Sequence, residues 1–153
     1  MRRAYFYALL ALCLFAMSLL LPALETSFLG APVVLSGWRT AFYGISAAGE
    51  SFQALVGGGD RISWKFILAG LSATFNVVFF LSPMVVRNLH SSRVRLAAVG
   101  VCSGVGFALG VFTSFAFADM KIMLQPGYYL WLLGYVVNVY AVFLALYESL
   151  RSD

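Results

Sequence analysis

Residues 96–117 read LAAVGVCSGVGFALGVFTSFAF and contain no charged side chain. A helix of this length extends about 33 Å, which is enough to cross the hydrocarbon core of a bilayer. At that depth every backbone polar group needs an internal partner, and a helix supplies those partners within one segment. The stretch therefore predicts a membrane-spanning helix and sets the fold class of the chain.

Three further apolar runs have the same character. They extend over residues 4–24, 64–86 and 128–147, and none has a charged residue or histidine beyond its first two positions. The whole chain is 62% hydrophobic and 10% charged, whereas ordinary soluble domains are about 45–50% apolar and about 25% charged. We therefore expect an all-α integral membrane protein with four transmembrane helices in a single membrane domain, residues 1–153.

The longest connection, residues 25–63, contains an amphipathic segment at 38–56. Its polar residues from Arg39 to Gln53 recur at intervals of 4, 3, 4 and 3, and apolar residues fill the opposite face. This spacing predicts a helix between the first and second spans that lies in the outer interface of the membrane or caps the bundle. Its apolar face is expected to be buried either in lipid or on the bundle. The residues assigned to this outer interfacial helix are Trp38, Arg39, Phe42, Ile45, Glu50 and Phe52.

The positive charges predict the orientation of the chain. If both termini are cytoplasmic, the inner side carries Arg2, Arg3, Arg87, Arg93, Arg95 and Arg151 against only Glu148 and Asp153, whereas the outer loops are balanced. Cytoplasmic loops are enriched in lysine and arginine, so we expect both termini inside. The arginine-rich loop at 87–95 either attracts anionic lipid head groups or forms a site for a partner. The basic residues form no nucleic-acid face, because they fall at segment ends and in loops.

Glycines recur at four-residue spacing in the third span. Gly100 is followed by Gly104, and Gly106 by Gly110, with Ser103 beside them. Such spacing lets two helix backbones approach closely, which favours helix packing in lipid. We expect these five residues at helix contacts, either within the bundle or between subunits.

Two amides lie near the middle of spans, Asn76 in the second and Asn138 in the fourth. A buried amide needs a hydrogen-bond partner, so both should face the bundle interior. There they can bond each other or reach Ser72, Ser103 or Tyr135. We interpret these two residues either as side chains whose hydrogen bonds join the helices or as the polar lining of a substrate path.

The spans contain no constellation of reactive side chains. Cys13 and Cys102 lie in separate apolar runs, and His90 is the only histidine, so the sequence predicts neither a metal site nor a disulfide framework. The interior also lacks an acid, base or nucleophile pair for proton or acyl chemistry. We expect no catalytic residue, no cofactor and no metal, and a protein that is not an enzyme.

Short motifs in the chain resemble those of small bacterial inner-membrane proteins with four spans. The motifs are Pro22-Ala23 after the first helix, Gly37-Trp38 at the amphipathic segment, and Gly127-Tyr128-Tyr129-Leu130-Trp131 at the last helix. The resemblance implies a four-span fold in a bacterial inner membrane and brings no activity with it.

Two classes of function agree with the sequence. The first is a non-catalytic membrane component, either an accessory or assembly subunit or a self-associating helical bundle. The alternative is an oligomeric pore, or a conduit for a small solute or lipid. The expected partners are membrane lipids and either further copies of the chain or the subunits of a larger membrane complex, with no nucleic acid.

Overall fold

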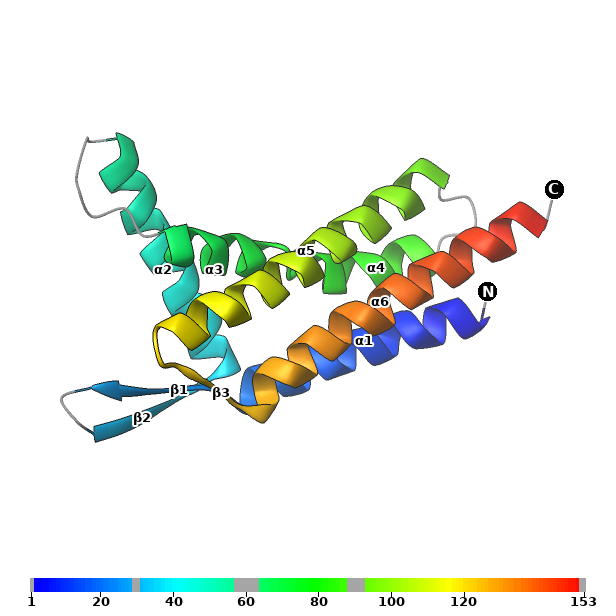
Figure 1. The fold of residues 1–153 in the computed structure, drawn as a ribbon. Helices are drawn as coiled ribbons and strands as arrows, with labels where there is room; N and C mark the ends of the chain where they lie inside the picture. The colour runs from blue at the N-terminus through cyan, green and yellow to red at the C-terminus, as the bar shows by residue number, and fades with distance from the viewer. Residues whose placement is uncertain (1, 29–30, 57–63, 88–92, 152–153) are drawn as a thin grey trace.

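The structure, a computed structural model, describes residues 2–28, 31–56, 64–87 and 93–151. Helices form most of it, and a small antiparallel sheet joins them at one end (Figure 1). The elements in chain order are α1 (Arg2–Leu20), β1 (Pro22–Phe28), β2 (Ala31–Ser36), α2 (Gly37–Val56), α3 (Trp64–Thr74), α4 (Val77–Arg87), α5 (Arg93–Asp119), β3 (Met123–Leu124) and α6 (Pro126–Arg151).

Four helical segments of the described chain are long and apolar enough to cross a membrane, as the sequence predicts. α1, α5 and α6 each form one such segment, and α3 and α4 together form another. Figure 1 shows these segments passing back and forth along the bundle. As a result, both termini, the end of α4 and the start of α5 lie at one end, which we call the terminal end. The sheet and α2 lie at the opposite end, which we call the sheet end.

The second span is not one continuous helix. α3 and α4 are separated by a turn at Phe75 and Asn76. The N–H of Asn76 donates to the carbonyl oxygen of Ala73 at 3.2 Å, and the N–H of Val78 donates to that of Phe75 at 3.0 Å. Bonds over three residues tighten the helix locally and interrupt the regular ladder. Pro83 lies inside α4 and away from the turn, so it does not cause the break.

A β-hairpin follows α1, where the sequence analysis expects the end of the first span and a loop. β1 and β2 pair antiparallel from Pro22↔Ser36 to Phe28↔Ala31, and β3 pairs with the other side of β1. The first span is therefore shorter than predicted, because its helix, α1, ends at Leu20. Proline at position 22 cannot donate to the preceding helical turn, which favours this end.

The core of the bundle follows a seam on α5. Its residues lie at alternating intervals of three and four, an arrangement typical of helices packed at a small crossing angle. They are Leu96, Val99, Ser103, Gly106, Gly110, Thr113 and Phe117. α6 packs against both α5 and α1, so it is the central helix of the bundle.

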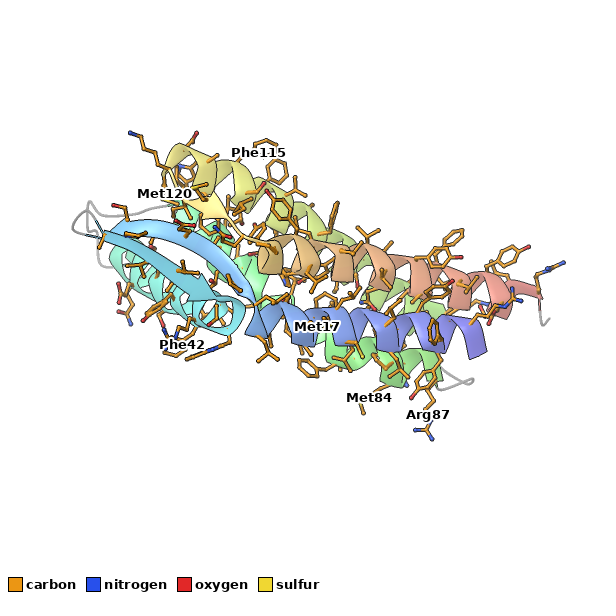
Figure 2. The ribbon with its side chains drawn as sticks, turned by 90° about the horizontal axis from the view of Figure 1, so that it is seen from below. Met17, Phe42, Met84, Arg87, Phe115 and Met120 are labelled. Atoms are coloured by element: carbon orange, nitrogen blue, oxygen red, sulfur yellow. The ribbon has the colours of Figure 1, made fainter. Side chains whose placement is uncertain are left out.

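Large apolar side chains cover the outside of the bundle. Phe115, Met84 and Phe42 are more than half exposed, and Figure 2 shows them pointing away from the helices that carry them. Soluble monomers rarely expose apolar surface on this scale. With the four candidate spans, this surface indicates a membrane protein.

Charged side chains lie at the two ends of the bundle. Arg3, Arg87, Arg93, Arg95 and Arg151 belong to the terminal end, whereas Lys65 of α3 forms an ion pair with Asp119 of α5 at the sheet end, with 3.3 Å between Nζ and Oδ2. The middle of the predicted arginine-rich loop, residues 88–92 with His90, lies outside the described residues.

Candidate functional site

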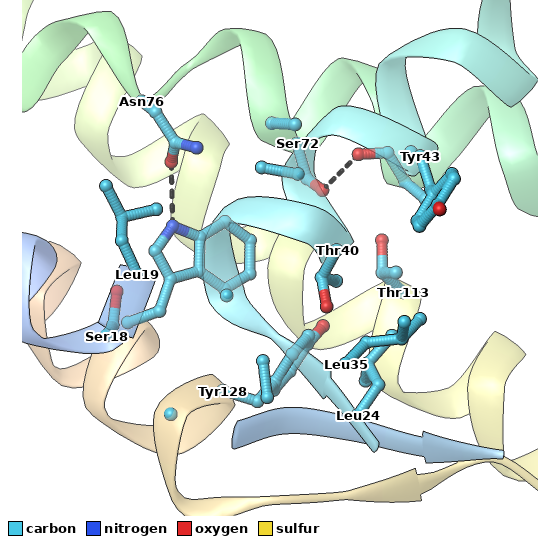
Figure 3. A pocket seen from close by; sticks show the side chains of 18 of the residues that line it. Ser18, Leu19, Leu24, Leu35, Thr40, Tyr43, Ser72, Asn76, Thr113 and Tyr128 are labelled. Atoms are coloured by element: carbon cyan, nitrogen blue, oxygen red, sulfur yellow. Dashed lines mark hydrogen bonds between the residues drawn. The ribbon is translucent and has the colours of Figure 1, made fainter. Parts of the chain in front are cut away.

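A pocket of about 330 Å³ lies at the sheet end, where α2 crosses the spanning helices (Figure 3). Its walls come from α1, α2, α3, α5 and α6 and from the two longer strands. Ligand pockets of proteins occupy about 300–1,000 Å³, so this cavity has room for a small molecule or part of a larger one. We take it as the candidate functional site.

The wall formed by α2 is held by a close crossing with α3. Gly44 lies against Ala69, and Ala48 lies against Gly70. A Cβ atom added at Gly70 would lie 2.9 Å from the carbonyl oxygen of Gly44 and would overlap the Cβ of Ala48. Only residues this small allow the two backbones to approach so closely.

Hydroxyl groups on the bundle side of the pocket are occupied by backbone carbonyl oxygens. A hydroxyl has one hydrogen to donate, so these groups have none left for a ligand. The bonds are Ser18 to Phe15 at 2.6 Å, Ser72 to Ala69 at 2.8 Å, Thr113 to Leu109 at 2.8 Å and Tyr128 to Gly110 at 2.7 Å.

Asn76 lines the pocket at the break in the second span. Its Oδ1 accepts hydrogen bonds from Trp131 Nε1 at 2.7 Å (Figure 3) and from the Tyr135 hydroxyl at 3.2 Å. The same hydroxyl lies 3.4 Å from the carbonyl oxygen of Ser72. That oxygen would accept the N–H of Asn76 in a continuous helix, but the turn directs this N–H to Ala73. The break therefore leaves the Ser72 carbonyl oxygen without its helical N–H and beside the Tyr135 hydroxyl, while Trp131 and Tyr135 of α6 bond the Asn76 side chain.

Polar groups without a described partner are found on α2. Thr40 Oγ1 is buried and has no hydrogen-bond partner among the described residues. Tyr43, Ser46 and Glu50 line the pocket and are also exposed, so they mark its mouth. They recur at helical spacing and form one edge of α2 that is about 10 Å long. The pocket thus has hydroxyls whose hydrogens are already donated on the bundle side and a polar edge on α2.

Asn138 lies outside the pocket, toward the terminal end. Its Nδ2 donates to Ser103 Oγ at 2.9 Å, and the Ser103 hydroxyl donates to the carbonyl oxygen of Val99 at 2.7 Å. Asn138 Oδ1 and Ser82 Oγ are buried without a hydrogen-bond partner among the described residues. Asn76 and Asn138 therefore each join two helices and do not bond each other.

Three of the four predicted packing glycines face α6. The nearest side-chain atoms to an added Cβ are Val142 Cγ1 at 3.1 Å for Gly100, Tyr135 Cε1 at 2.6 Å for Gly106 and Leu132 Cδ2 at 2.7 Å for Gly110. Ser103, the fifth predicted packing residue, is fully buried on the same seam. These residues lie at contacts within one chain.

Gly104 differs from the other three glycines. A Cβ added there would have no described atom within 4 Å, so the structure does not place Gly104 at a helix contact within the chain. It follows Ser103 by one residue, which turns it about 100° away from the seam. A contact between subunits at Gly104 stays a prediction.

A helix is present as α2 at the predicted position, but its large apolar side chains do not pack on the bundle. Trp38, Phe42, Ile45 and Phe52 are about half exposed or more, and the Arg39 guanidinium lies over the Trp38 ring, 5.3 Å from its centre. The small residues of the predicted apolar face, such as Ala48, lie at the contact with α3, whereas these large side chains lie outside it. Burial of the face in lipid stays a prediction.

The pocket does not follow from the sequence patterns, although one pattern in α2 indicates the wall that this helix forms. Small residues form a separate face of that helix, at intervals of 4, 3, 4 and 3. They are Gly37, Ala41, Gly44, Ala48 and Ser51, and all are at least partly buried. A face of small residues beside a face of large apolar ones indicates that the small face packs on protein.

No group of three or more His, Cys, Asp or Glu side chains that could hold a metal ion occurs among the described residues. Cys13 and Cys102 are free thiols. Comparison of the chain with known proteins finds no matching family model, no similar curated protein and no similar solved structure.

Proposed function

We propose that the chain is a non-catalytic membrane component, either an accessory or assembly subunit of a larger complex or a bundle that associates with copies of itself. The observation that carries this proposal is that polar side chains in the spans form hydrogen bonds between helices. Asn76, Ser103, Asn138 and Tyr135 all take part in hydrogen bonds between helices. Groups bonded in this way hold helices together, and none forms the nucleophile and base pair that acyl or proton chemistry requires.

The proposed location is a bacterial inner membrane, with both termini in the cytoplasm. Support comes from the arginines, which lie mainly at the terminal end, whereas basic and acidic residues are balanced at the sheet end. Such an excess of arginine favours the cytoplasmic side. Membrane lipids are then partners of the exposed apolar surface.

A conduit is the second candidate, and the pocket favours it. However, all the residues that line the pocket lie at the sheet end or near the break in the second span. Beyond the break, Phe79, Tyr135 and Asn138 are fully buried and fill the interior. A conduit would therefore have to form between several copies of the chain.

Native mass spectrometry of the protein, extracted gently from its own membrane, tests the proposal. We expect a reproducible complex heavier than the 16.7 kDa chain, containing either a second protein or further copies. A closed ring of copies that conducts ions or solutes in a planar bilayer would favour the conduit. A chain without any protein companion would contradict the proposed role.

A further inference from the structure

We propose that the pocket beneath α2 binds one acyl chain of a membrane phospholipid, whose ammonium-bearing head group lies at the edge formed by Tyr43, Ser46 and Glu50. The proposal goes beyond the role as a membrane component, because it assigns a ligand that does not depend on the protein partner. Its starting point is the difference between the two sides of the pocket.

The bundle side of the pocket suits methylene groups better than water. Water in a cavity needs two to four polar partners. The hydroxyl hydrogens of Ser18, Ser72, Thr113 and Tyr128 are already donated to carbonyl oxygens, so these four groups offer water acceptor sites only, among walls that are otherwise mainly apolar. Apolar walls with no atoms opposite them lose dispersion contacts, which an apolar occupant restores. In a membrane protein, the surrounding acyl chains supply such an occupant.

The size of the pocket corresponds to part of one acyl chain. A methylene group takes up about as much room as a water molecule, roughly 30 Å³. The cavity of about 330 Å³ therefore holds about ten carbon atoms. The remainder of the chain and the head group must lie outside, on the side where the pocket opens.

The pocket opens along the polar edge of α2, because Tyr43, Ser46 and Glu50 both line it and are exposed. Glu50 is the acidic residue of this edge, and no described residue forms an ion pair with it. Arg39 lies at the far end of the same face of α2, eleven residues before Glu50, with its guanidinium over the Trp38 ring. A carboxylate favours a nearby ammonium group and disfavours an anionic one. The edge therefore favours phosphatidylethanolamine over phosphatidylglycerol.

Photo-crosslinking in lipid nanodiscs tests the proposal. The probes are phosphatidylethanolamine and phosphatidylglycerol, each with a diazirine in the middle of one acyl chain, and the labelled residues are identified by peptide mass spectrometry. We expect labelling of Thr113 and Phe117, which are 2% and 6% exposed and line the pocket. Labelling confined to outward residues such as Phe112 and Phe115 would show surface lipid only and would overturn the proposal.

Pocket-filling variants separate specific labelling from chance contact. Ala73→Phe and Ala47→Phe fill the cavity from two different walls, so each should abolish labelling of Thr113 and Phe117. Ala118→Phe, at an exposed position of α5, is the matched control and should leave labelling unchanged. A folded filling variant that is still labelled like the wild type would overturn the assignment.

The head-group assignment is tested with Glu50→Gln, which keeps the shape of the side chain and removes its charge. The wild type should label more strongly with phosphatidylethanolamine than with phosphatidylglycerol, and the variant should lose this preference. Equal labelling of the wild type by both lipids would overturn the placement of the head group. Pocket labelling by a small aromatic diazirine but not by either lipid would assign the cavity to a compact solute instead.

Discussion

Replacing Gly70 with alanine tests the close crossing of α2 over α3. The added Cβ would lie 2.9 Å from the carbonyl oxygen of Gly44 and would overlap the Cβ of Ala48. Neither neighbour can rotate away, since one belongs to the backbone and the other is the only side-chain carbon of its residue. α2 must therefore shift as a unit, which would also change the pocket that it covers.

The matched control for this substitution is Gly49→Ala. Gly49 is exposed on α2, and a Cβ added there has no described neighbour within 4 Å. Both variants gain the helix propensity of alanine, about 0.8–1 kcal/mol per residue. Only Gly70→Ala introduces overpacking, which costs about 1–3 kcal/mol. The difference in the free energy of unfolding between the two variants should therefore be about 1–3 kcal/mol.

Two measurements check this prediction in detergent micelles. Thermal unfolding followed by circular dichroism should give a lower midpoint for Gly70→Ala than for Gly49→Ala. Amide hydrogen exchange should become faster along α2 in Gly70→Ala only, because the docked state is weakened. Equal midpoints with unchanged exchange would refute the close crossing.

Three further predictions concern the bundle and its orientation. Gly106→Leu should lower the unfolding midpoint in micelles, because its Cβ would lie 2.6 Å from the Tyr135 ring. Gly104→Leu should leave the midpoint of the monomer unchanged, because its Cβ would have no described neighbour. A lower midpoint for Gly104→Leu than for Gly106→Leu would contradict the seam on α5. A double-mutant cycle with Asn138→Ala and Ser103→Ala should give a coupling energy of about 0.6–2 kcal/mol, and zero coupling would mean that their hydrogen bond contributes nothing. A single cysteine at position 27, in a background without other cysteines, should react with a membrane-impermeant maleimide added outside intact cells. Reaction only after the cells are opened would reverse the proposed orientation.

Local sequence patterns predicted the helical content of the fold well. The third and fourth spans were predicted at 96–117 and 128–147, and the structure extends them by a few residues to Arg93–Asp119 and Pro126–Arg151. The added residues include the charged ends Arg93, Arg95, Asp119, Glu148 and Arg151, and hydrophobicity marks only the part of a helix that suits the bilayer core. The position of α2 also followed from the periodicity of its residues. The periodicity of the polar residues did not predict which face of α2 packs on α3.

The candidate site was harder to predict because its residues are individually ordinary. Thr113 and Tyr128 belong to apolar helices, and their hydroxyls bond to backbone carbonyl oxygens. The break at Phe75 and Asn76 likewise has no proline or glycine to mark it. It is supported by Trp131, which is 55 residues away in the sequence.

The sequence by itself determined that four segments are apolar enough to cross a membrane and that arginine is concentrated in the segments that share the terminal end. Both properties are sums over neighbouring residues, since the free energy of transfer into lipid depends mainly on the side chains of the segment itself. Tertiary structure alone decided the break in the second span, the contact of α2 with α3 and the pocket beneath it. These features depend on which faces meet, because a cavity and an interhelical hydrogen bond exist only between residues that packing brings together.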